Sequence, residues 1–549
     1  MGDVIQTSPL IHGLRLKYPD AHIALMVRTL GETVAQRNPD VNEVLAYHED
    51  ALFKDLVSND SRRLLRAYCA AEEYIQKLRA CKFDVAYNCT NSIASAVLLK
   101  AAGIPEVVGA HFSDDGEYLI RGKWTNYFYT SLYNRDYSDF NLCDVFRNFL
   151  EEPPCSGKLV FEVRQSDRDA LHELLRQRNV CDGRPLICFQ LGASDKEKRW
   201  PVERFAQLAK CLKHLFDAQI LLVGVKAEEE LGRQFDELLP GVAVPLYGET
   251  SLPQLGALLD ESAVLVSNDT GTMHIAAAVG CPVVLVSIGY VHFRETGPYG
   301  EGHIAVEAHG QNSRESAAFP KSTPIQASHV LFAVRAILEK DEPPSPAKDE
   351  FAAVDLYRSA LAPDGHLAWR PLLPRPLQES DVLRSAYRAM WLDFLSDGKE
   401  TAHEQESLRA FLSCHDTGGF PATATIEVET APFTELARIA QEGISKTREL
   451  LTILGENRSM REAQPLVAAL RNLDERIRLF GELHPSTRPL SASAAFQRDA
   501  LEGSDPVQLA RTTLQIYDGL ARKSALMGTK LRLISSTWQE LGGASASHG

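Results

Sequence analysis

Short β-rich apolar runs alternate with longer helical patterns from about residue 10 to about residue 340, and this alternation limits the possible folds. The runs AHIALMV (21–27), VNEVLAY (41–47) and FDVAYNC (83–89) predict strands. A helical pattern at 92–103 leads to a further strand-like run, EVVGA (106–110). Strands that alternate with helices form βαβ units around a parallel sheet, so the predicted class is α/β.

A second series of the same kind begins after PPCSGK (153–158). It predicts strands at 185–192, 218–224, 263–269 and 282–289, and helices at 201–216 and 251–262. The runs are nearly continuously apolar, as in strands covered on both faces. We therefore expect two doubly wound, Rossmann-like domains, 1–155 and 156–340, that face a cleft at the C-terminal ends of their strands.

The pattern changes at KDEPPSPAKDE, and residues 341–352 are typical of a linker. Apolar residues at three- and four-residue spacing then predict amphipathic helices at 433–454, 464–483 and 505–536. We expect an all-α domain over 353–540 and a disordered tail over 541–549. An autonomous bundle is favoured, and docking on a protein partner or a membrane is the alternative. Few contacts should then cross the linker.

The composition excludes several classes of function. The formal net charge of −15 argues against a nucleic-acid partner. No apolar run approaches the roughly 20 residues of a membrane-spanning helix. The ten cysteines form no C-x-x-C pair, which is typical of reduced cysteines in a cytoplasmic protein. The chain shows no metal-ligand cluster, G-x-G-x-x-G or Walker lysine motif, so we expect neither a metal nor a cofactor.

The stretch VSNDTGTMHIAAAVGCP (266–282) carries the strongest candidate site. An apolar strand ends there in a small turn, and a helix opens at Thr272. A helix N-terminus offers unpaired N–H groups and a positive dipole end, which suit a phosphate. The candidate residues are Asp269, Thr270, Gly271 and His274. Spacing alone favours a structural alternative, in which Asp269 or Thr270 caps the helix.

Two more strand ends carry polar residues. In QLGASDKEKRWP (190–201) a turn of small residues with Ser194 precedes the cations Lys196, Lys198 and Arg199. A solvated loop would look similar, but two such turns at equivalent places in one domain favour a diphosphate site. In VGVKAEEELG (223–232) an acid, Glu228 or Glu229, could accept hydrogen bonds from a ribose, although acids in a first helical turn are often capping features.

Together these motifs resemble the ADP-heptose:lipopolysaccharide heptosyltransferases, glycosyltransferase family 9, whose fold is GT-B. The segment 2–27 with NPDVNEV (38–44) is similar to the N-terminal βα unit of that family. GAS, KRWP and VSNDTGTMH resemble its donor-site motifs, and RETGPYG (294–300) resembles its loop after the last donor strand. The resemblance covers about residues 1–340.

The resemblance implies roles for single residues. Asp3 matches the base that takes the proton from the acceptor hydroxyl. The donor contacts that it implies are Ser194, Lys198, Asp269, Thr270, Gly271 and His274, with Glu229 chosen from the acid run for the nucleoside. It also implies inverting transfer without a metal. Asp3, with Gln6 three residues later, is equally typical of a capping box, which is the structural alternative.

The implied function is transfer of heptose, or a related sugar, from a nucleotide-diphosphate donor such as ADP-heptose. The acceptor would be a lipopolysaccharide core or another cell-envelope glycan in a bacterium, on the cytoplasmic side, with peripheral contact to the inner membrane left open. Another donor sugar, or a protein or surface-polysaccharide acceptor, is the alternative within the class. A degenerate GT-B scaffold for the helical domain is the alternative of another class, and the retained site residues argue against it.

The opening MGDVIQTSP gives a separate expectation. In the family this turn follows the first strand of the N-terminal sheet, and no such apolar run precedes Gly2 here. A central strand contributes buried apolar side chains and backbone hydrogen bonds. Their summed stabilisation is comparable to the whole free energy of unfolding of a domain, roughly 5–15 kcal/mol. The sequence therefore predicts a gap in the N-terminal sheet and a natural start upstream of Met1.

Overall fold

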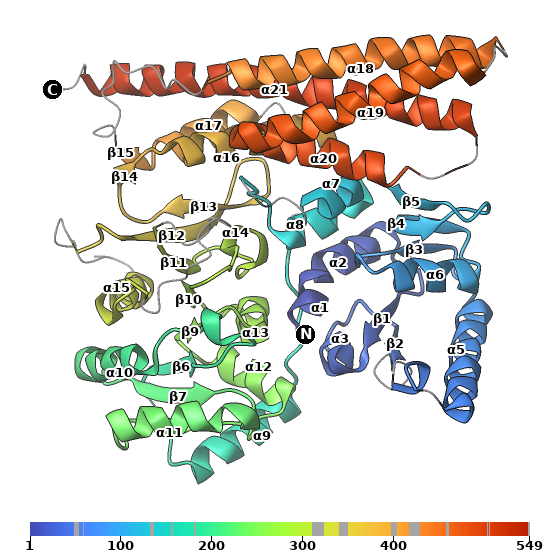
Figure 1. Cartoon of the computed structure of the whole chain (residues 1–549). Helices are drawn as coiled ribbons and strands as arrows, with labels where there is room; N and C mark the ends of the chain where they lie inside the picture. Colours follow the sequence, from blue (N-terminus) through green and yellow to red (C-terminus); the bar gives the residue numbers. More distant parts are fainter. Residues whose placement is uncertain are drawn as a thin grey trace. The chain divides into compact units, whose positions relative to one another are not determined.

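The computed structural model describes residues 1–48, 54–58, 60–131, 135, 137–154, 157–180, 183–309, 323–339, 350–396, 403–416, 429–456, 460–501, 503 and 505–546. The chain divides into two compact units, each built from two separate segments (Figure 1). The first unit contains Met1–Ala51 and Phe140–Pro374. The second contains Leu52–Asp139 and Arg375–Gly549.

An eight-stranded sheet forms the centre of the first unit, in the order β13-β12-β11-β10-β9-β6-β7-β8. Its strands are β6 (Leu186–Gln190), β7 (Gln219–Val223), β8 (Ala243–Pro245), β9 (Val264–Ser267), β10 (Val283–Ser287), β11 (Ile304–Ala308), β12 (Val354–Leu361) and β13 (Leu367–Pro371). The six strands from β11 to β8 run parallel, as predicted, and β12 and β13 are antiparallel.

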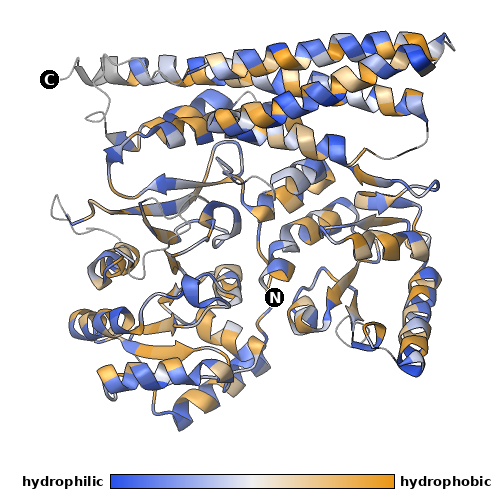
Figure 2. Cartoon of the chain, in the orientation of Figure 1, coloured by the Kyte–Doolittle hydropathy of each residue, from blue (hydrophilic) through white to orange (hydrophobic). Residues whose placement is uncertain are grey.

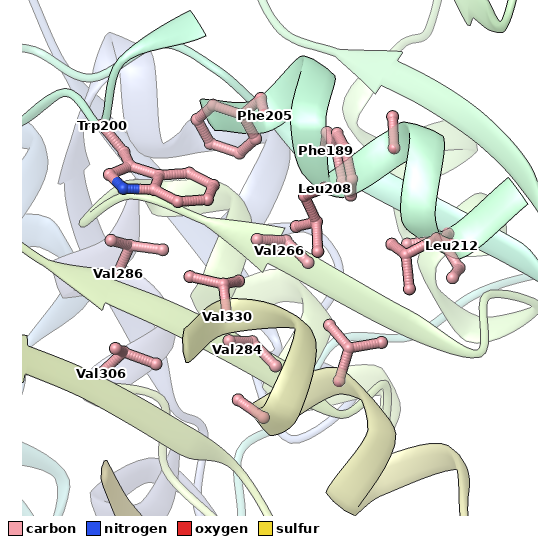
Figure 3. Close-up of a cluster of buried hydrophobic side chains, with 14 of the residues drawn as sticks. Phe189, Trp200, Phe205, Leu208, Leu212, Val266, Val284, Val286, Val306 and Val330 are labelled. Atoms are coloured by element: carbon pink, nitrogen blue, oxygen red, sulfur yellow. The ribbon is translucent and has the colours of Figure 1, made fainter. Parts of the chain in front are cut away.

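Helices cover both faces of this sheet, which explains the continuous apolar runs of its strands. All residues of β9, β10 and β11 are buried. One core packs α10 (Val202–Phe216), α11 (Glu229–Leu238) and α15 (Ala327–Leu338) on one face, around Trp200, Phe205 and Val266 (Figure 3). The other core packs α9 (Gln165–Gln177), α12 (Leu252–Asp260) and α13 (Gly271–Val279) on the opposite face.

Local signals explain where two of these helices begin and end. Ser251 and Gln254 form a capping box at the start of α12, with Pro253 in the first turn. Helix α13 ends at Gly280, which adopts a left-handed φ of 86°. Glycine suits that conformation because it has no Cβ, and the chain turns there and enters β10 three residues later.

The strands β12 and β13 correct the expectation of an all-α region from residue 353. Strand β12 pairs with β11 from Val354 opposite Ala308 to Arg358 opposite Ile304, and β13 pairs with β12. The premise that few contacts cross the linker is therefore wrong, because the chain beyond it completes the sheet that precedes it. Most of the predicted linker, residues 341–349, lies outside the described residues.

The N-terminal segment of the first unit contains α1 (Gly2–Gln6), α2 (Ser8–Lys17), β1 (Ala24–Arg28), α3 (Glu32–Ala35) and β2 (Glu43–Tyr47). Strands β1 and β2 pair in parallel and form a sheet of their own. The strands that the sequence predicts next, from 83 onward, belong to another sheet. Strands β3 (Val85–Tyr87), β4 (Glu106–Phe112) and β5 (Tyr118–Arg121) form that sheet in the second unit, and the expected gap in the N-terminal sheet stays a prediction.

The segment that returns from Phe140 contains α8 (Leu142–Arg147) and is fixed to the large sheet by buried polar contacts. Asp144 accepts hydrogen bonds from the Tyr299 hydroxyl at 2.6 Å and from the Leu367 N–H at 2.8 Å. Tyr299 of the RETGPYG motif thus fixes the loop after β10 to Asp144 of α8. Short helix α14 (Phe293–Thr296) begins that loop.

The second unit combines a small sheet with helices from both of its segments. Its elements are α5 (Ser61–Cys81), β3 (Val85–Tyr87), α6 (Ile93–Ala102), β4 (Glu106–Phe112), β5 (Tyr118–Arg121), α7 (Lys123–Ser131), β14 (Arg375–Pro376), α16 (Glu379–Leu395), α17 (Glu404–Leu412), β15 (His415–Asp416), α18 (Ala431–Gly455), α19 (Met460–Leu483), α20 (Arg488–Asp499) and α21 (Pro506–Ala546). The last helix covers most of the predicted disordered tail, and 547–549 lie outside the described residues.

The three long C-terminal helices that the sequence predicts are present. Helices α18 and α21 pack along each other, and apolar and polar residues alternate along them (Figure 2). None of the described helices is both long and apolar enough to cross a membrane. The helices are not an autonomous bundle, because α16 and α20 also pack on the segment that ends at Asp139. The ring of Tyr127 lies 5.1 Å from that of Trp391, and Tyr137 stacks on Tyr387.

One buried lysine allows a test of this helical packing. Lys523 of α21 is 3% exposed, and its ammonium lies 5.1 Å and 5.2 Å from the rings of Trp391 and Phe394. Burial lowers the pKa of Lys523 from 10.5 to about 8. The unfolded chain therefore binds more protons than the folded chain between pH 8 and 10.5, and stability rises with pH through that window. We expect Lys523→Met to raise the melting temperature at pH 7 and to lose this advantage by pH 10.

Lys530 on the same helix is the matched control. Its ammonium lies 3.0 Å from Asp393 and 2.8 Å from Glu404, so Lys530→Met leaves two carboxylates without their cation and should lower the melting temperature. Melting followed by circular dichroism from pH 7 to 10 measures both variants. A Lys523→Met protein that melts below the wild type at every pH would contradict the argument.

Candidate functional site

The candidate site lies at the edge of the large sheet where β6, β7, β9 and β10 end. These strands are parallel, so the turns that follow them meet at one edge. The predicted residues 190–201 follow β6, and the predicted residues 268–274 follow β9. All of them belong to the first unit, together with Asp3.

Asn268 joins the turn after β9 to the turn after β6. Its side chain is fully buried, and its amide nitrogen donates to the carbonyls of Gln190 (3.3 Å), Leu191 (2.9 Å) and Gly192 (3.2 Å). Its amide oxygen accepts the Trp200 N–H at 2.9 Å. Asn268 was not among the predicted site residues, because its partners lie far away in the sequence.

Lys198 and Asp269, both predicted donor contacts, form an ion pair at this edge. Lys198 ends a 3₁₀ turn (Lys196–Lys198), and its Nζ donates to Asp269 Oδ2 at 2.8 Å. The N-cap of α13 is Thr270, and no side chain caps this helix. The capping alternative for Asp269 and Thr270 is therefore wrong: the Asp269 carboxylate binds the lysine, and the helix N–H groups have no side-chain acceptor.

Tyr290, which the sequence did not indicate, lies over the same lysine. Its ring centroid is 4.5 Å from Lys198 Nζ, and its hydroxyl donates to Asp195 Oδ2 at 3.2 Å. The other oxygen of Asp195 accepts the Glu197 N–H at 3.0 Å, and this bond lowers the pKa of Asp195. Asp195 and Tyr290 thus hold the 3₁₀ turn that carries Lys198.

Glu228, rather than the predicted Glu229, lies at the edge of the sheet. Its Oε2 accepts from Gln190 Nε2 at 3.0 Å and from the Val225 N–H at 3.1 Å, and Gln190 Oε1 accepts from Thr272 at 3.1 Å. Glu229 is exposed and pairs with Lys226 at 2.9 Å, a contact that lowers the pKa of Glu229. The structure therefore brings Glu228, and not Glu229, to the turn after β6, and the nucleoside contact of the acid run stays a prediction.

Close approach explains the glycine in the turn after β6. A Cβ atom on Gly192 would overlap the carboxylate of Glu228. Only a residue without a side chain leaves room for Glu228 beside this turn. Ser194, two residues later, is exposed at the surface of the turn.

His274 is buried in the first turns of α13, against the start of the chain. A Cβ atom on Gly2 would lie 2.7 Å from its ring, so α1 packs directly on this histidine. Burial lowers the pKa of His274 to about 4, although the charges of Asp269 and Asp3 oppose the shift. His274 is therefore neutral at pH 7, and its Nδ1 has no hydrogen-bond partner among the described residues.

Asp3 is exposed in the first turn of α1. The N-cap of that helix is Met1, and no side chain caps it. The capping-box alternative for Asp3 and Gln6 is therefore wrong, and Gln6 is buried instead. Helix α1 packs on α13, and Asp3 lies in the same unit as the turns after β6 and β9.

No group of three or more His, Cys, Asp or Glu residues that could hold a metal ion occurs in the described part of the chain. Positive groups at the edge include Lys198, Arg199, whose guanidinium donates to the Ala193 carbonyl, and the N-terminus of α13. Such an edge, with a lysine and a free helix N-terminus, is suited to a phosphate group.

The mixed α/β fold and its strand-end turns agree with the predicted GT-B fold class. Residues 72–322 match the family "Glycosyltransferase family 9 (heptosyltransferase)". The matched range contains the turns after β6, β7 and β9 and does not contain Asp3.

Named relatives agree with this family. The chain is 27% identical over 303 residues to lipopolysaccharide heptosyltransferase 2 of Escherichia coli (strain K12), covering 52% of this chain and 79% of the relative. It is 26% identical over 301 residues to lipooligosaccharide heptosyltransferase 2 of Haemophilus ducreyi, covering 52% and 80%. Among solved structures, the glycosyl transferase family 9 protein of Veillonella parvula DSM 2008 shares the fold at a TM-score of 0.51 and 21% identity. That match covers 62% of this chain and 95% of the other.

Gly192 allows a test of the position of Glu228. We expect Gly192→Ala to weaken binding of a nucleoside diphosphate about tenfold, because the added methyl group displaces the carboxylate, a loss of about 1.4 kcal/mol. Isothermal titration calorimetry with ADP measures the affinity. The double variant Gly192→Ala/Glu228→Ala should bind no more weakly than Glu228→Ala alone, since both changes act on one contact.

Gly455→Ala is the control for the Gly192 experiment, because a Cβ atom there meets no atom within 4 Å. It should leave ADP affinity and melting temperature unchanged. Additive losses in the double variant would show that Gly192 acts independently of Glu228.

Proposed function

We propose that the chain transfers heptose from a nucleotide-diphosphate donor, ADP-heptose, to a lipid-linked glycan acceptor of the lipopolysaccharide-core type. The observation that carries the proposal is the pair Lys198–Asp269 beside the uncapped N-terminus of α13. The relatives named as lipopolysaccharide heptosyltransferases support the sugar and the acceptor class.

Lys198 and α13 would stabilise the leaving group. As the bond between the anomeric carbon and the phosphate oxygen breaks, negative charge grows on the diphosphate. The Lys198 ammonium and the N–H groups of Gly271 and Thr272 supply positive charge without reorganisation, because both are already held in place. Transfer would therefore proceed without a metal ion.

Glu228 would bind the nucleoside. Its Oε2 is fixed by Gln190 and by the Val225 N–H, which orients the carboxylate at the end of β7. A carboxylate accepts two hydrogen bonds from a ribose diol well, since each oxygen has free lone pairs. The neutral His274 can donate or accept one hydrogen bond near the turn.

Asp3 would act as the general base. The acceptor hydroxyl attacks the anomeric carbon from the side opposite the leaving diphosphate and gives its proton to the carboxylate. Attack from the opposite side inverts the configuration at that carbon. Another donor sugar or acceptor would use the same groups, and a donor screen by thermal shift separates these cases because a bound ligand raises the melting temperature. A protein that binds no nucleotide sugar would support the scaffold alternative.

Lys198→Ala tests the donor site. We expect weaker donor binding and slower transfer, from the loss of roughly 1.5–3 kcal/mol of charged hydrogen bonding. The control is Lys196→Ala, which removes an exposed lysine from the same 3₁₀ turn and should leave both quantities unchanged. Titration with ADP and a transfer assay with ADP-heptose give the two readouts. Equal effects of the two variants would reject the assignment of Lys198.

Asp3→Asn tests the base. Transfer should fall about 100-fold or more, as expected for a lost general base. Donor affinity and melting temperature should change little, because Asp3 caps no helix. Asp20→Asn, at another exposed acid of the same segment, is the control and should keep full activity. A melting temperature that falls while turnover stays normal would make Asp3 a structural residue.

A further inference from the structure

The N-terminal half of α5 and the residues before it expose a cluster of large apolar side chains. Leu64, Leu65 and Tyr68 lie on the first two turns of α5, and Leu65 and Tyr68 are 63% and 66% exposed. Leu56 and Val57, just before the helix, are exposed as well. Only Ala67 and Leu78 are buried among the 21 residues of α5. Large exposed apolar clusters commonly mark interaction surfaces.

An ion pair places the two parts of this cluster next to each other. Arg66 Nε on the second turn of α5 lies 3.5 Å from Asp55 Oδ2, which directly precedes Leu56. The apolar side chains before the helix therefore lie beside the turn that carries Leu65. We call the surface formed by Leu56, Val57, Leu64, Leu65 and Tyr68 the α5 patch.

The α5 patch has a basic border on an acidic chain. Arg62 and Arg63 lie on the first turn of α5, and neither has a carboxylate partner among the described residues. The net charge of the whole chain is −15. A general attraction of this protein to anionic surfaces is therefore unfavourable. At the α5 patch, Arg62 and Arg63 add local positive charge beside exposed leucines, while the nearby acids Asp60 and Asp55 cap α5 and pair with Arg66.

From these observations we infer that the α5 patch docks on the surface of a membrane that contains anionic lipids. The leucines and the ring of Tyr68 would enter the boundary between headgroups and acyl chains, as in amphipathic helices that lie in the interface. Arg62 and Arg63 would contact lipid phosphates while their aliphatic stems stay along the apolar boundary. This inference does not depend on which sugar the protein transfers.

Vesicle sedimentation with the full chain tests the inference. The wild type should bind vesicles of phosphatidylethanolamine and phosphatidylglycerol, bind neutral phosphatidylcholine vesicles more weakly, and bind less at high salt. Leu65→Ser/Tyr68→Ser should reduce binding more than tenfold. Arg62→Ser/Arg63→Ser should reduce it roughly fivefold for each arginine. Both double variants change exposed side chains, so their circular dichroism spectra and melting temperatures should match those of the wild type.

Leu479→Ser/Leu483→Ser on α19 is the matched control. These two leucines are also exposed, but the neighbouring arginines Arg476 and Arg478 already pair with Glu442 and Glu475. Vesicle binding should be unchanged in this variant. An effect equal to that of Leu65→Ser/Tyr68→Ser would overturn the assignment to the α5 patch.

Two further results would overturn the inference. One is a wild-type protein that does not sediment with anionic vesicles. The other is self-association, measured by analytical ultracentrifugation, that the Leu65→Ser/Tyr68→Ser variant abolishes while vesicle binding is absent. The patch would then be an interface between two copies of the chain.

Discussion

The buried side chain of Asn268 holds together the sheet edge on which the candidate site depends. Its nitrogen bonds three carbonyls at the end of β6, and its oxygen bonds the N–H of Trp200. One uncharged side chain at the end of β9 thus bonds buried backbone groups at the end of β6 and in the turn that follows it, and a buried backbone group left without a partner costs roughly 1–3 kcal/mol. Because the two turns are joined there, the residues that follow them are held at fixed separation.

The joined turns explain how Lys198 can be paired with Asp269 and still be held in position to contact a ligand. Asp269 and the ring of Tyr290 hold its ammonium, so little side-chain freedom remains to be lost when a ligand binds. A diphosphate at this edge would be repelled by Asp269 and attracted by Lys198 and by the N-terminus of α13. The pair therefore orients the lysine, while the uncapped helix supplies the additional positive potential that a phosphate needs.

Apolar runs predicted the strands of the large sheet well, since burial on both faces leaves a continuous signal. The sequence also predicted that the turns carrying Lys198 and Asp269 lie at one edge, and the ion pair between the two residues is seen only in the structure. Asn268 could not be predicted, because its carbonyl partners lie 76 to 78 residues earlier in the chain. Glu228 and Glu229 are adjacent acids of the same run. The 3₁₀ turn Lys226–Glu228 points the side chain of Glu228 toward Gln190 and leaves that of Glu229 exposed. Strands β12 and β13 were missed because the polar, proline-rich stretch before them suggested a domain boundary.

The last 200 residues are part of both units rather than an addition to them. Strands β12 and β13 extend the sheet that carries the candidate site, and the helices from α16 onward pack with the segment 52–139. A sheet of three strands such as β3, β4 and β5 buries little apolar surface by itself. Helices α6 and α7 pack on this sheet, and the contacts of Tyr127 with Trp391 and of Tyr137 with Tyr387 extend that packing to α16. The C-terminal region therefore stabilises the part of the family fold that β3, β4 and β5 form, and loss of the helices would expose its apolar side chains.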